Sequence, residues 1–419
     1  MLRRLLIVSS ALAAVWAAPA HASTFCGTSA SADRAPNVVA GYPVHVGYAV
    51  PSDGADRFGQ FASQIQTDAE AIDGWWRGQD PTRAPRFDLF PFSCGSQLDL
   101  TTVRLSRTGA QLANPNTAFD AIVSATQSAR LLTTFEKLLV YYDGPVSDLD
   151  ACGIGGGDPN GAGAAVVLLA SCPKEPTSTT AAHELLHSFG AVPQGAPHNC
   201  LPPDSGHTCD NTQDIMYPFG FGSALSSLLL DPGRDDYYGH SGTFWDVQDS
   251  KWLVDLDAQV QLSLAISGTG SVSSNVPGLA CAASCATTWN RGTELTLMPK
   301  GGPGTRLVRW TGACTGSGSC NVQLGQSSAV SAVFGPATFS LTVAVTGRGT
   351  IRVGSAATCS SRCSRALPSF TPIMLRAKGA TGWRFKAWSG ACKGTRATCS
   401  VRMTAAASAR ATFVRAKTA

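Results

Sequence analysis

Two histidines and a glutamate stand close together in the stretch HELLH at residues 183–187. His183 and His187 are four residues apart, so on a helix both imidazoles project from the same face towards one ion. Glu184 sits one step round the helix, where its carboxylate can take a proton from a water beside that ion. The spacing therefore predicts a zinc site with a general base.

The third zinc ligand is harder to place, because a catalytic zinc normally takes three protein ligands and one water. The next glutamate after Glu184 is Glu294, in a separate repeated segment, so a downstream glutamate is excluded. The remaining candidates are His198, His207, His240 and aspartates such as Asp204. Gly190 is expected to end the helix, and eight further residues suffice to bring His198 back beneath the metal. We predict His198 as the third ligand and His207 as the alternative.

The surrounding sequence carries a family resemblance. HELLHSFGAV, APH at 196–198 and GHTCDNTQDIMY at 206–217 together resemble the secreted metzincin-type zinc proteases of actinobacteria and related bacteria, over about residues 40–255. The resemblance implies that the third histidine follows an Ala-Pro pair, as His198 does, and that Met216 belongs to a Met-turn beneath the histidines. Pro193 occupies the position where better-known metzincins carry their third histidine.

The resemblance also implies how a substrate binds. An extended peptide would add to the edge strand before the helix, here expected at about residues 164–170. Phe219 and Phe221 would flank the pocket for the side chain after the scissile bond, although both could instead be core aromatics. Tyr217 could donate a hydrogen bond to an oxyanion or could be a buried structural tyrosine. Residues 235–253 match the C-terminal helix region of the group.

Hydrophobic periodicity predicts the elements around the motif. Strands are expected at 42–50, 86–92, 136–144 and 164–171, and helices at 56–76, 117–132 and over the motif. The stretch GIGGGDPNGAG at 153–163 lacks the Lys-Ser/Thr of a phosphate loop and is expected to be a flexible loop near the cleft. This order predicts an α/β (α+β) catalytic domain, with a mixed sheet and an active-site helix.

The C-terminal part repeats itself. WTGACTGSGSC at 310–320 returns as WSGACKGTRATC at 388–399, and CAASC at 281–285 returns as CSSRC at 359–363. Alternating segments between these cysteines predict two small all-β modules with local disulfides, which resemble the Gly-Trp-x-Gly-Ala-Cys β-repeats of secreted bacterial enzymes. We expect a signal peptide at 1–22, a catalytic domain at 23–258, and repeats at 259–336 and 337–419.

Several features predict a secreted, extracellular protein. Residues 1–22 have a basic start, an apolar run and a small-x-small ending, and no later stretch is apolar enough for a transmembrane segment. All fourteen cysteines follow this segment, which predicts disulfides. Their order favours the pairs Cys26–Cys94, Cys152–Cys172 and Cys200–Cys209, the last of which would pin the loop beyond His198.

Charge is divided unevenly along the chain. Residues 23–260 contain 12 Lys and Arg against 27 Asp and Glu, a balance of −15, whereas residues 261–419 contain 18 against 1, a balance of +17. Residues 337–419 carry 14 Lys and Arg and no acid, so an anionic cell-surface polymer is a candidate partner. No specific nucleic acid is predicted, because Trp383 and Trp388 are expected to pack the core.

A second metal is a weaker prediction. Aspartates gather after the motif, between residues 204 and 236, and Ca²⁺ is possible in an exported protease. No EF-hand-like spacing is present, so a solvated acidic surface is the preferred interpretation.

These observations predict a secreted zinc metalloendopeptidase that hydrolyses a protein or peptide substrate. His183, His187 and His198 would hold one Zn²⁺, and Glu184 would be the general base. The alternative is a non-enzymatic, adhesin-like surface protein on a vestigial protease fold, whose basic repeats bind polyanions. Glu184 argues against it, because a purely structural zinc needs no carboxylate there. A third possibility is an enzyme that acts on a non-peptide amide or ester.

Overall fold

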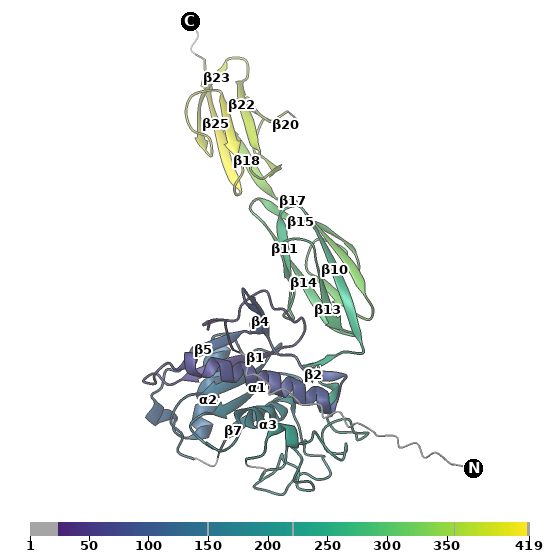
Figure 1. Cartoon of the computed structure of the whole chain (residues 1–419). Helices are drawn as coiled ribbons and strands as arrows, with labels where there is room; N and C mark the ends of the chain where they lie inside the picture. Colours follow the sequence, from purple (N-terminus) through teal and green to yellow (C-terminus); the bar gives the residue numbers. More distant parts are fainter. Residues whose placement is uncertain (1–23, 149–150, 220–221, 356, 417–419) are drawn as a thin grey trace, which may run out of the picture.

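The computed structural model describes residues 24–148, 151–219, 222–355 and 357–416. The predicted signal peptide lies outside the described residues. A mixed α/β part is followed by two all-β repeats, one after the other along the molecule (Figure 1). None of the described helices is long and apolar enough to cross a membrane.

The α/β part contains three α-helices, α1 (Phe58–Gln79), α2 (Pro115–Ser128) and α3 (Thr177–Phe189), among its described residues. Short 3₁₀ helices lie at Gly109–Leu112, Leu225–Ser227 and Val247–Asp249. Its strands are β1 (Val44–Val50), β2 (Arg83–Pro85), β3 (Leu89–Phe92), β4 (Gly95–Leu98), β5 (Leu100–Arg104), β6 (Lys137–Tyr142), β7 (Gly153–Gly157), β8 (Gly163–Leu168) and β9 (Leu253–Asp255).

Five of these strands form the central sheet, in the order β5-β1-β6-β8-β7. The first four are parallel, and only β7, at the edge, runs antiparallel to its neighbour β8. Two expectations are therefore wrong: residues 164–170 are not the edge, and the Gly-rich stretch at 153–157 is a strand. Glycine is depleted in strands, and β7 has four glycines in five residues, which is why the pattern predicts a loop.

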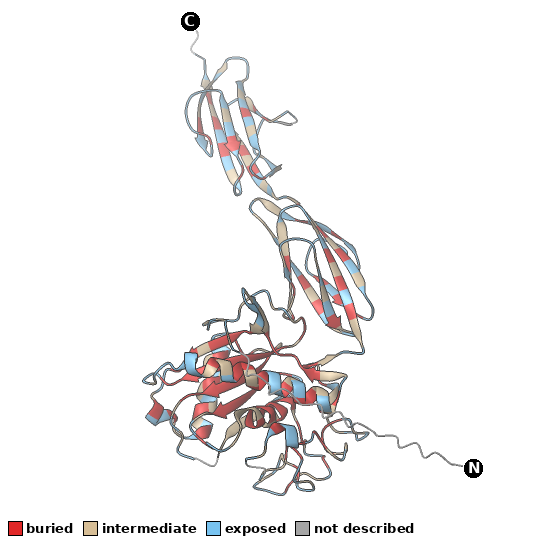
Figure 2. Cartoon of the chain, in the orientation of Figure 1, coloured by how far each residue is buried: buried red, intermediate tan, exposed pale blue. Residues whose placement is uncertain are grey.

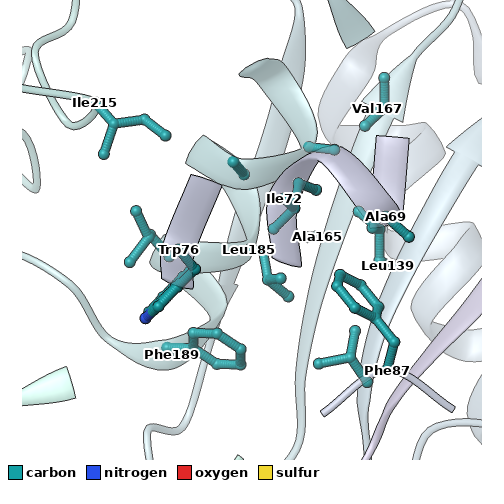
Figure 3. Close-up of a cluster of buried hydrophobic side chains, with 14 of the residues drawn as sticks. Ala69, Ile72, Trp76, Phe87, Leu139, Ala165, Val167, Leu185, Phe189 and Ile215 are labelled. Carbon is teal, nitrogen blue, oxygen red and sulfur yellow. The ribbon is translucent and has the colours of Figure 1, made fainter. Parts of the chain in front are cut away.

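Helices cover both faces of the sheet. Leu139, Ala165 and Val167 point towards α1 and α3, where they meet Trp76, Leu185 and Phe189 (Figure 3). The alternate residues of the same strands, such as Val140 and Val166, point to the other face and pack against Ile122 of α2. The side-chain period of two thus buries both faces, and the sheet becomes a rigid support for α3.

Each repeat is a sandwich of two four-stranded sheets. The first consists of β10 (Gln259–Ser267), β11 (Gly270–Ser274), β12 (Ala280–Cys281), β13 (Cys285–Asn290), β14 (Glu294–Gly301), β15 (Thr305–Gly312), β16 (Cys320–Gln323) and β17 (Ser328–Pro336). The second consists of β18 (Thr338–Thr346), β19 (Gly349–Val353), β20 (Ala357–Cys359), β21 (Cys363–Pro368), β22 (Pro372–Gly379), β23 (Trp383–Gly390), β24 (Thr398–Arg402) and β25 (Ala407–Arg415). Their sheets have matching orders, β13-β10-β17-β15 with β12-β11-β14-β16, and β21-β18-β25-β23 with β20-β19-β22-β24. Burial alternates along these strands (Figure 2).

All fourteen cysteines are paired. The structure contains the three predicted N-terminal disulfides, Cys26–Cys94, Cys152–Cys172 and Cys200–Cys209, which confirms those pairings. Each repeat adds two local disulfides, Cys281–Cys285 and Cys314–Cys320, then Cys359–Cys363 and Cys392–Cys399. Disulfides in this number are typical of proteins that fold in oxidising compartments.

Asn290 of the first repeat makes side-chain hydrogen bonds to the α/β part, beside a backbone hydrogen bond from Gly41 to the carbonyl oxygen of Pro277 at 3.0 Å. The Oδ1 atom of Asn290 accepts hydrogen bonds from Arg86 at 2.7 Å and from the backbone N–H of Asp255 at 3.0 Å. Its Nδ2 atom donates to the carbonyl oxygen of Leu253 at 2.9 Å. Arg86 is buried, and this burial lowers its pKa to about 10, so Asn290 supplies an acceptor to a cation that water hardly reaches.

The segment 235–253 is not the helix that the resemblance implies. Its regular structure consists of the 3₁₀ turn Val247–Asp249 and the first residue of β9. The Asp231 carboxylate accepts hydrogen bonds from the backbone N–H groups of Asp236 at 3.1 Å, Tyr237 at 2.8 Å and Tyr238 at 2.7 Å. A side chain that binds successive backbone donors in this way competes with helix formation.

Candidate metal centre

Three histidines meet above the motif helix. The Nε2 atoms of His183 and His187 lie 3.2 Å apart, and each lies 3.3 Å from Nε2 of His207. Three nitrogens held 2.0–2.1 Å from a tetrahedral zinc would lie about 3.3 Å apart. The triangle therefore has the size that a zinc ion requires.

The hydrogen bonds of the outer ring nitrogens fix two of the tautomers. Nδ1 of His183 donates to the carbonyl oxygen of Ile215 at 2.6 Å, and Nδ1 of His207 donates to the carbonyl oxygen of Asp204 at 3.0 Å. In a neutral ring the proton on Nδ1 leaves a lone pair on Nε2, so lone pairs face one another inside the triangle. A cation between them removes the repulsion, which is the usual arrangement of ligating histidines.

Burial keeps these rings neutral. It lowers the pKa of His183 to about 4, with a further contribution from His207, and it also lowers the pKa values of His187 and His207. Neutral imidazole is the form that binds a metal.

His207 reaches the motif helix from a short disulfide-closed hairpin. The backbone N–H of Cys200 donates to the carbonyl oxygen of His207 at 2.8 Å, and the backbone N–H of Cys209 donates to the carbonyl oxygen of His198 at 3.0 Å. The Cys200–Cys209 disulfide closes the same hairpin. The hairpin therefore holds His207 rigidly in place. The i, i+4 spacing of His183 and His187 on the helix gives no information about this position.

His198 is not in the triangle, so the structure corrects the predicted ligand position in favour of the alternative. The backbone N–H of His198 donates to Oδ1 of Asp236 at 2.8 Å, and its Nδ1 lies 3.1 Å from Oδ2. The Asp236 side chain is only 2% exposed, so it needs both contacts. The side-chain hydrogen bond and the charge of Asp236 raise the pKa of His198. The helix does end at Gly190, with φ of 86°, but His198 lies beside Asp236 and not beside His183 and His187.

Met216 lies in a tight turn next to the histidines. The backbone N–H of Tyr217 donates to the carbonyl oxygen of Asp214 at 3.0 Å, and Met216 is fully buried. Two hydrogen bonds connect the turn to the site. The carbonyl oxygen of Ile215 accepts from Nδ1 of His183, and the carbonyl oxygen of Met216 accepts from the backbone N–H of Thr208 at 3.0 Å. The turn thus couples α3 to the hairpin that carries His207.

Glu184 faces a cavity beside the triangle. The cavity has a volume of about 180 Å³ and is lined by His183, Glu184, His207, Tyr217, Glu175 and Leu228, among others. Glu184 is 7% exposed, and burial raises its pKa to about 8. Tyr217 is half-buried at the wall of the cavity, consistent with either expected role.

The predicted aromatic pocket is placed differently. Phe219 is 59% exposed and packs on Tyr217, with ring centroids 5.8 Å apart, but it does not line the cavity. Phe221 lies outside the described residues. Glu175 and Leu228 take part in the cavity instead, and no sequence pattern singles them out because each comes from a loop or turn beside α3.

Two glycines bring the edge strand against α3. A Cβ atom at Gly153 would lie 2.8 Å from Oε1 of Glu184, and one at Gly155 would lie 2.2 Å from its carbonyl oxygen. Any larger residue would push β7 away from the helix. The glycine-rich composition of β7 therefore lets the last strand of the sheet run directly past Glu184.

The acidic residues near His198 form a second group. Carboxylate oxygens of Asp210 and Asp236 lie with His198 within 4.8 Å of one another, as do those of Asp231, Asp235 and Asp236. Asp231 is bound to backbone donors and Asp236 to His198, so their oxygens already have partners. Ca²⁺ binding stays an untested prediction.

Comparisons with known proteins give a family only for the second repeat, and no curated protein matches the chain. Residues 339–417 match the divergent InlB B-repeat domain. Among solved structures, OgpA from Akkermansia muciniphila is 9% identical over 82% of this chain and 91% of its own, with a TM-score of 0.32. A catalytically inactive OgpA, solved in complex with an O-glycopeptide substrate, has a TM-score of 0.28 at 9% identity, covering 82% of this chain and 90% of its own.

The Bacillus anthracis TIE protein is 6% identical over 39% of this chain, which spans 35% of that protein, with a TM-score of 0.25. Similarity at this level assigns no activity to the chain.

Proposed function

We propose that this chain is a zinc-dependent endopeptidase of the metzincin type. The single observation that supports this function best is the triangle of histidine nitrogens, 3.2–3.3 Å on each side, beside the buried Glu184. His183, His187 and His207 would hold the ion. When bound, zinc supplies Lewis acidity to a water and to the carbonyl of the bond to be cleaved.

Glu184 would be the general base. Its carboxylate lies in the cavity that His183 and His207 also line, so it can receive a proton from a water there and later pass that proton to the leaving amine. Burial raises its affinity for a proton, which suits a group that must carry one during the reaction. A carboxylate has no such role at a purely structural zinc, and this favours an enzyme over an adhesin-like protein.

The edge strand β7 would bind the substrate backbone. It is the last strand of the sheet and runs past Glu184, and one side of it pairs with no other strand of the described residues, so an extended peptide could pair there. Pairing to backbone groups is independent of side chains, so this mode supports binding of peptides with varied sequences. Tyr217, at the cavity wall, would face the carbonyl of the bound peptide.

The test compares the wild-type chain with Glu184→Gln and, as a matched control, Glu175→Gln, which alters the other glutamate of the same cavity. Zinc content is measured by mass spectrometry, and cleavage is measured on casein and on a peptide library. We expect about one zinc per chain in all three. Glu184→Gln should lose activity by roughly 10²–10⁴-fold, while Glu175→Gln should keep most of it.

Three outcomes would contradict the proposal. A wild-type chain without zinc removes its basis, and equal cleavage by Glu184→Gln and wild type removes the general base. Zinc in every variant without cleavage of any library peptide would favour the adhesin-like alternative.

A further inference from the structure

The second repeat carries cations that nothing within it can neutralise. Residues 337–419 contain 14 Lys and Arg and no Asp or Glu. The ion pairs among the described residues all lie between Arg34 and Asp255, outside both repeats. The positive charge of this module is therefore available to an external partner.

Four of these cations share one exposed sheet face. Arg352 on β19, Arg376 and Lys378 on β22, and Arg402 on β24 are all exposed and alternate with buried residues of the same strands. We call these four residues the basic face. Arg352 and Arg376 are direct cross-strand partners, an arrangement that is unfavourable for like charges.

The first repeat shows that the fold does not need this arrangement. Its strands β11, β14 and β16 pair in the same order, but Ser273 stands opposite Met298 where the second repeat has Arg352 opposite Arg376. Gln323 occupies the end of β16 as Arg402 occupies the end of β24. The same sandwich thus forms without arginine at these three positions, so folding does not explain why the second repeat carries arginines there.

The shape of the basic face favours a linear ligand. Arg376 and Lys378 are two residues apart on β22, roughly 7 Å along the strand, and Arg402 pairs with Pro372, roughly 13 Å from Arg376. The cations thus follow one strand for about 20 Å. Three of the four are arginines, whose planar guanidinium groups bind carboxylate, sulfate and phosphate groups by paired hydrogen bonds.

The surroundings of the face disfavour other anions. Trp388 is buried and donates its Nε1–H to the carbonyl oxygen of Arg396 at 3.0 Å, and Trp383 packs against the core, so neither offers a stacking platform for single-stranded nucleic acid. The large apolar side chains exposed beside the cations are Met374, at 41%, and Phe370, at 44%, whose carbonyl oxygen accepts from Arg402. Two such side chains are little for insertion into a lipid surface.

From these observations we infer that the basic face binds a linear anionic polysaccharide. Figure 1 places the second repeat at the end of the molecule remote from the α/β part. The chain would be held on the glycan by this module while the metal centre stays accessible. The inference does not depend on the proposed peptidase activity.

The test uses the full chain and immobilised heparin as the anionic polysaccharide. Arg352→Ser/Arg376→Met installs the residues of the first repeat. Arg384→Ala/Arg410→Ala is the matched control, because it removes the same charge from exposed positions of the other sheet. We expect salt-dependent retention of the wild type, at least tenfold weaker binding by the first variant, and near wild-type binding by the control. Unchanged or higher Tm of the first variant would show that its fold is intact.

Two further probes distinguish the ligand classes, namely vesicles of phosphatidylglycerol with phosphatidylcholine and a single-stranded oligothymidylate. Preferential binding to either of these over heparin would overturn the polysaccharide assignment. Equal loss of binding in both double variants would show diffuse attraction to net charge and would overturn the specific face. Absence of wild-type retention at low salt would also overturn it.

Discussion

Asp236 holds His198 by two contacts, one to its backbone N–H at 2.8 Å and one to Nδ1 at 3.1 Å. His198 thus anchors one strand of the hairpin while His207, on the other strand, faces the motif helix. His198 thus stabilises the hairpin and His207 completes the histidine triangle, so substituting one or the other should affect different properties.

His207→Ala is expected to abolish stoichiometric zinc binding, with affinity reduced by more than about 100-fold, because an outer-shell partner alone is worth 10–100-fold. His198→Ala should keep zinc and lose about 1–2 kcal/mol of stability, since Asp236 loses one of its two donors. Zinc titration with a competing chelator measures the first effect, and denaturant unfolding measures the second. The reverse pattern would restore His198 as the ligand.

Gly155→Ala should reduce both activity and stability. Its new methyl group would meet the carbonyl oxygen of Glu184 at 2.2 Å and the Cβ atom of His187 at 2.8 Å, which forces β7 away from α3. Gly156→Ala is the matched control, because nothing lies within 4 Å of a Cβ at that position. We expect a loss of about 1–3 kcal/mol for the first variant and little change for the second, measured by thermal unfolding together with peptide cleavage. Equal effects of the two would argue against the close contact.

Removal of the Cys200–Cys209 disulfide should weaken zinc binding as well as the fold. The disulfide closes a loop with a sequence separation of 9, so its loss is expected to cost about 2–3 kcal/mol. Cys200→Ser/Cys209→Ser frees the hairpin that presents His207, and the zinc dissociation rate should rise. Cys392→Ser/Cys399→Ser, with a comparable separation of 7 in the second repeat, should leave zinc dissociation unchanged. If both variants release zinc at the wild-type rate, the hairpin does not depend on its disulfide.

Stability should fall as pH rises towards mild alkalinity. His45 is buried, and although burial alone would lower its pKa, the hydrogen bond and charge of Asp88, with Asp33 and Glu136, raise it to about 8. A raised pKa contributes stability fully below the unfolded value of 6.5 and loses it as pH rises through about 8. Asp33 and Glu136, with pKa values raised to about 7, act in the same direction.

The contribution of His45 is on the order of 2 kcal/mol. Calorimetric unfolding of the wild type and of His45→Gln across this pH range measures it, and the variant should show a flatter pH dependence. A wild-type stability that rises from neutral to mildly alkaline pH would contradict the assignment.

The sequence predicts local parts of the site well and distant parts poorly. His183, Glu184 and His187 belong to one helix, so the helical period alone sets their geometry. His207 depends on a disulfide and on Asp236, 38 residues from its partner His198, and no local period encodes such contacts. The prediction of His198 rested on the chain reversal expected at Gly190 and on the Ala-Pro pair that precedes His198 in the resemblance to metzincins, and neither of these depends on the contacts that place His207.

The strands, like the site, were predicted where a local sequence pattern is sufficient and missed where a contact between two elements decides. Residues 42–50, 136–144 and 164–171 are largely apolar, and each contains a strand of the sheet. The edge strand β7 was missed because its glycines serve contact with α3, a tertiary requirement that overrides strand propensity. Such positions are found from the packing of two elements, not from either element alone.

The position of Asn290 has a practical consequence for dividing the protein. A fragment that stops at residue 258 would lose Asn290, one of the two acceptors of Arg86, the other being the carbonyl oxygen of Ala40. It would also uncover Ala40, which packs in the core of the first repeat. The shortest piece that preserves both surfaces therefore runs through β17, to Pro336. Preparations that end at residue 258 would carry an exposed apolar patch, and poor yield from them would reflect the missing first repeat and not a defect at the three histidines.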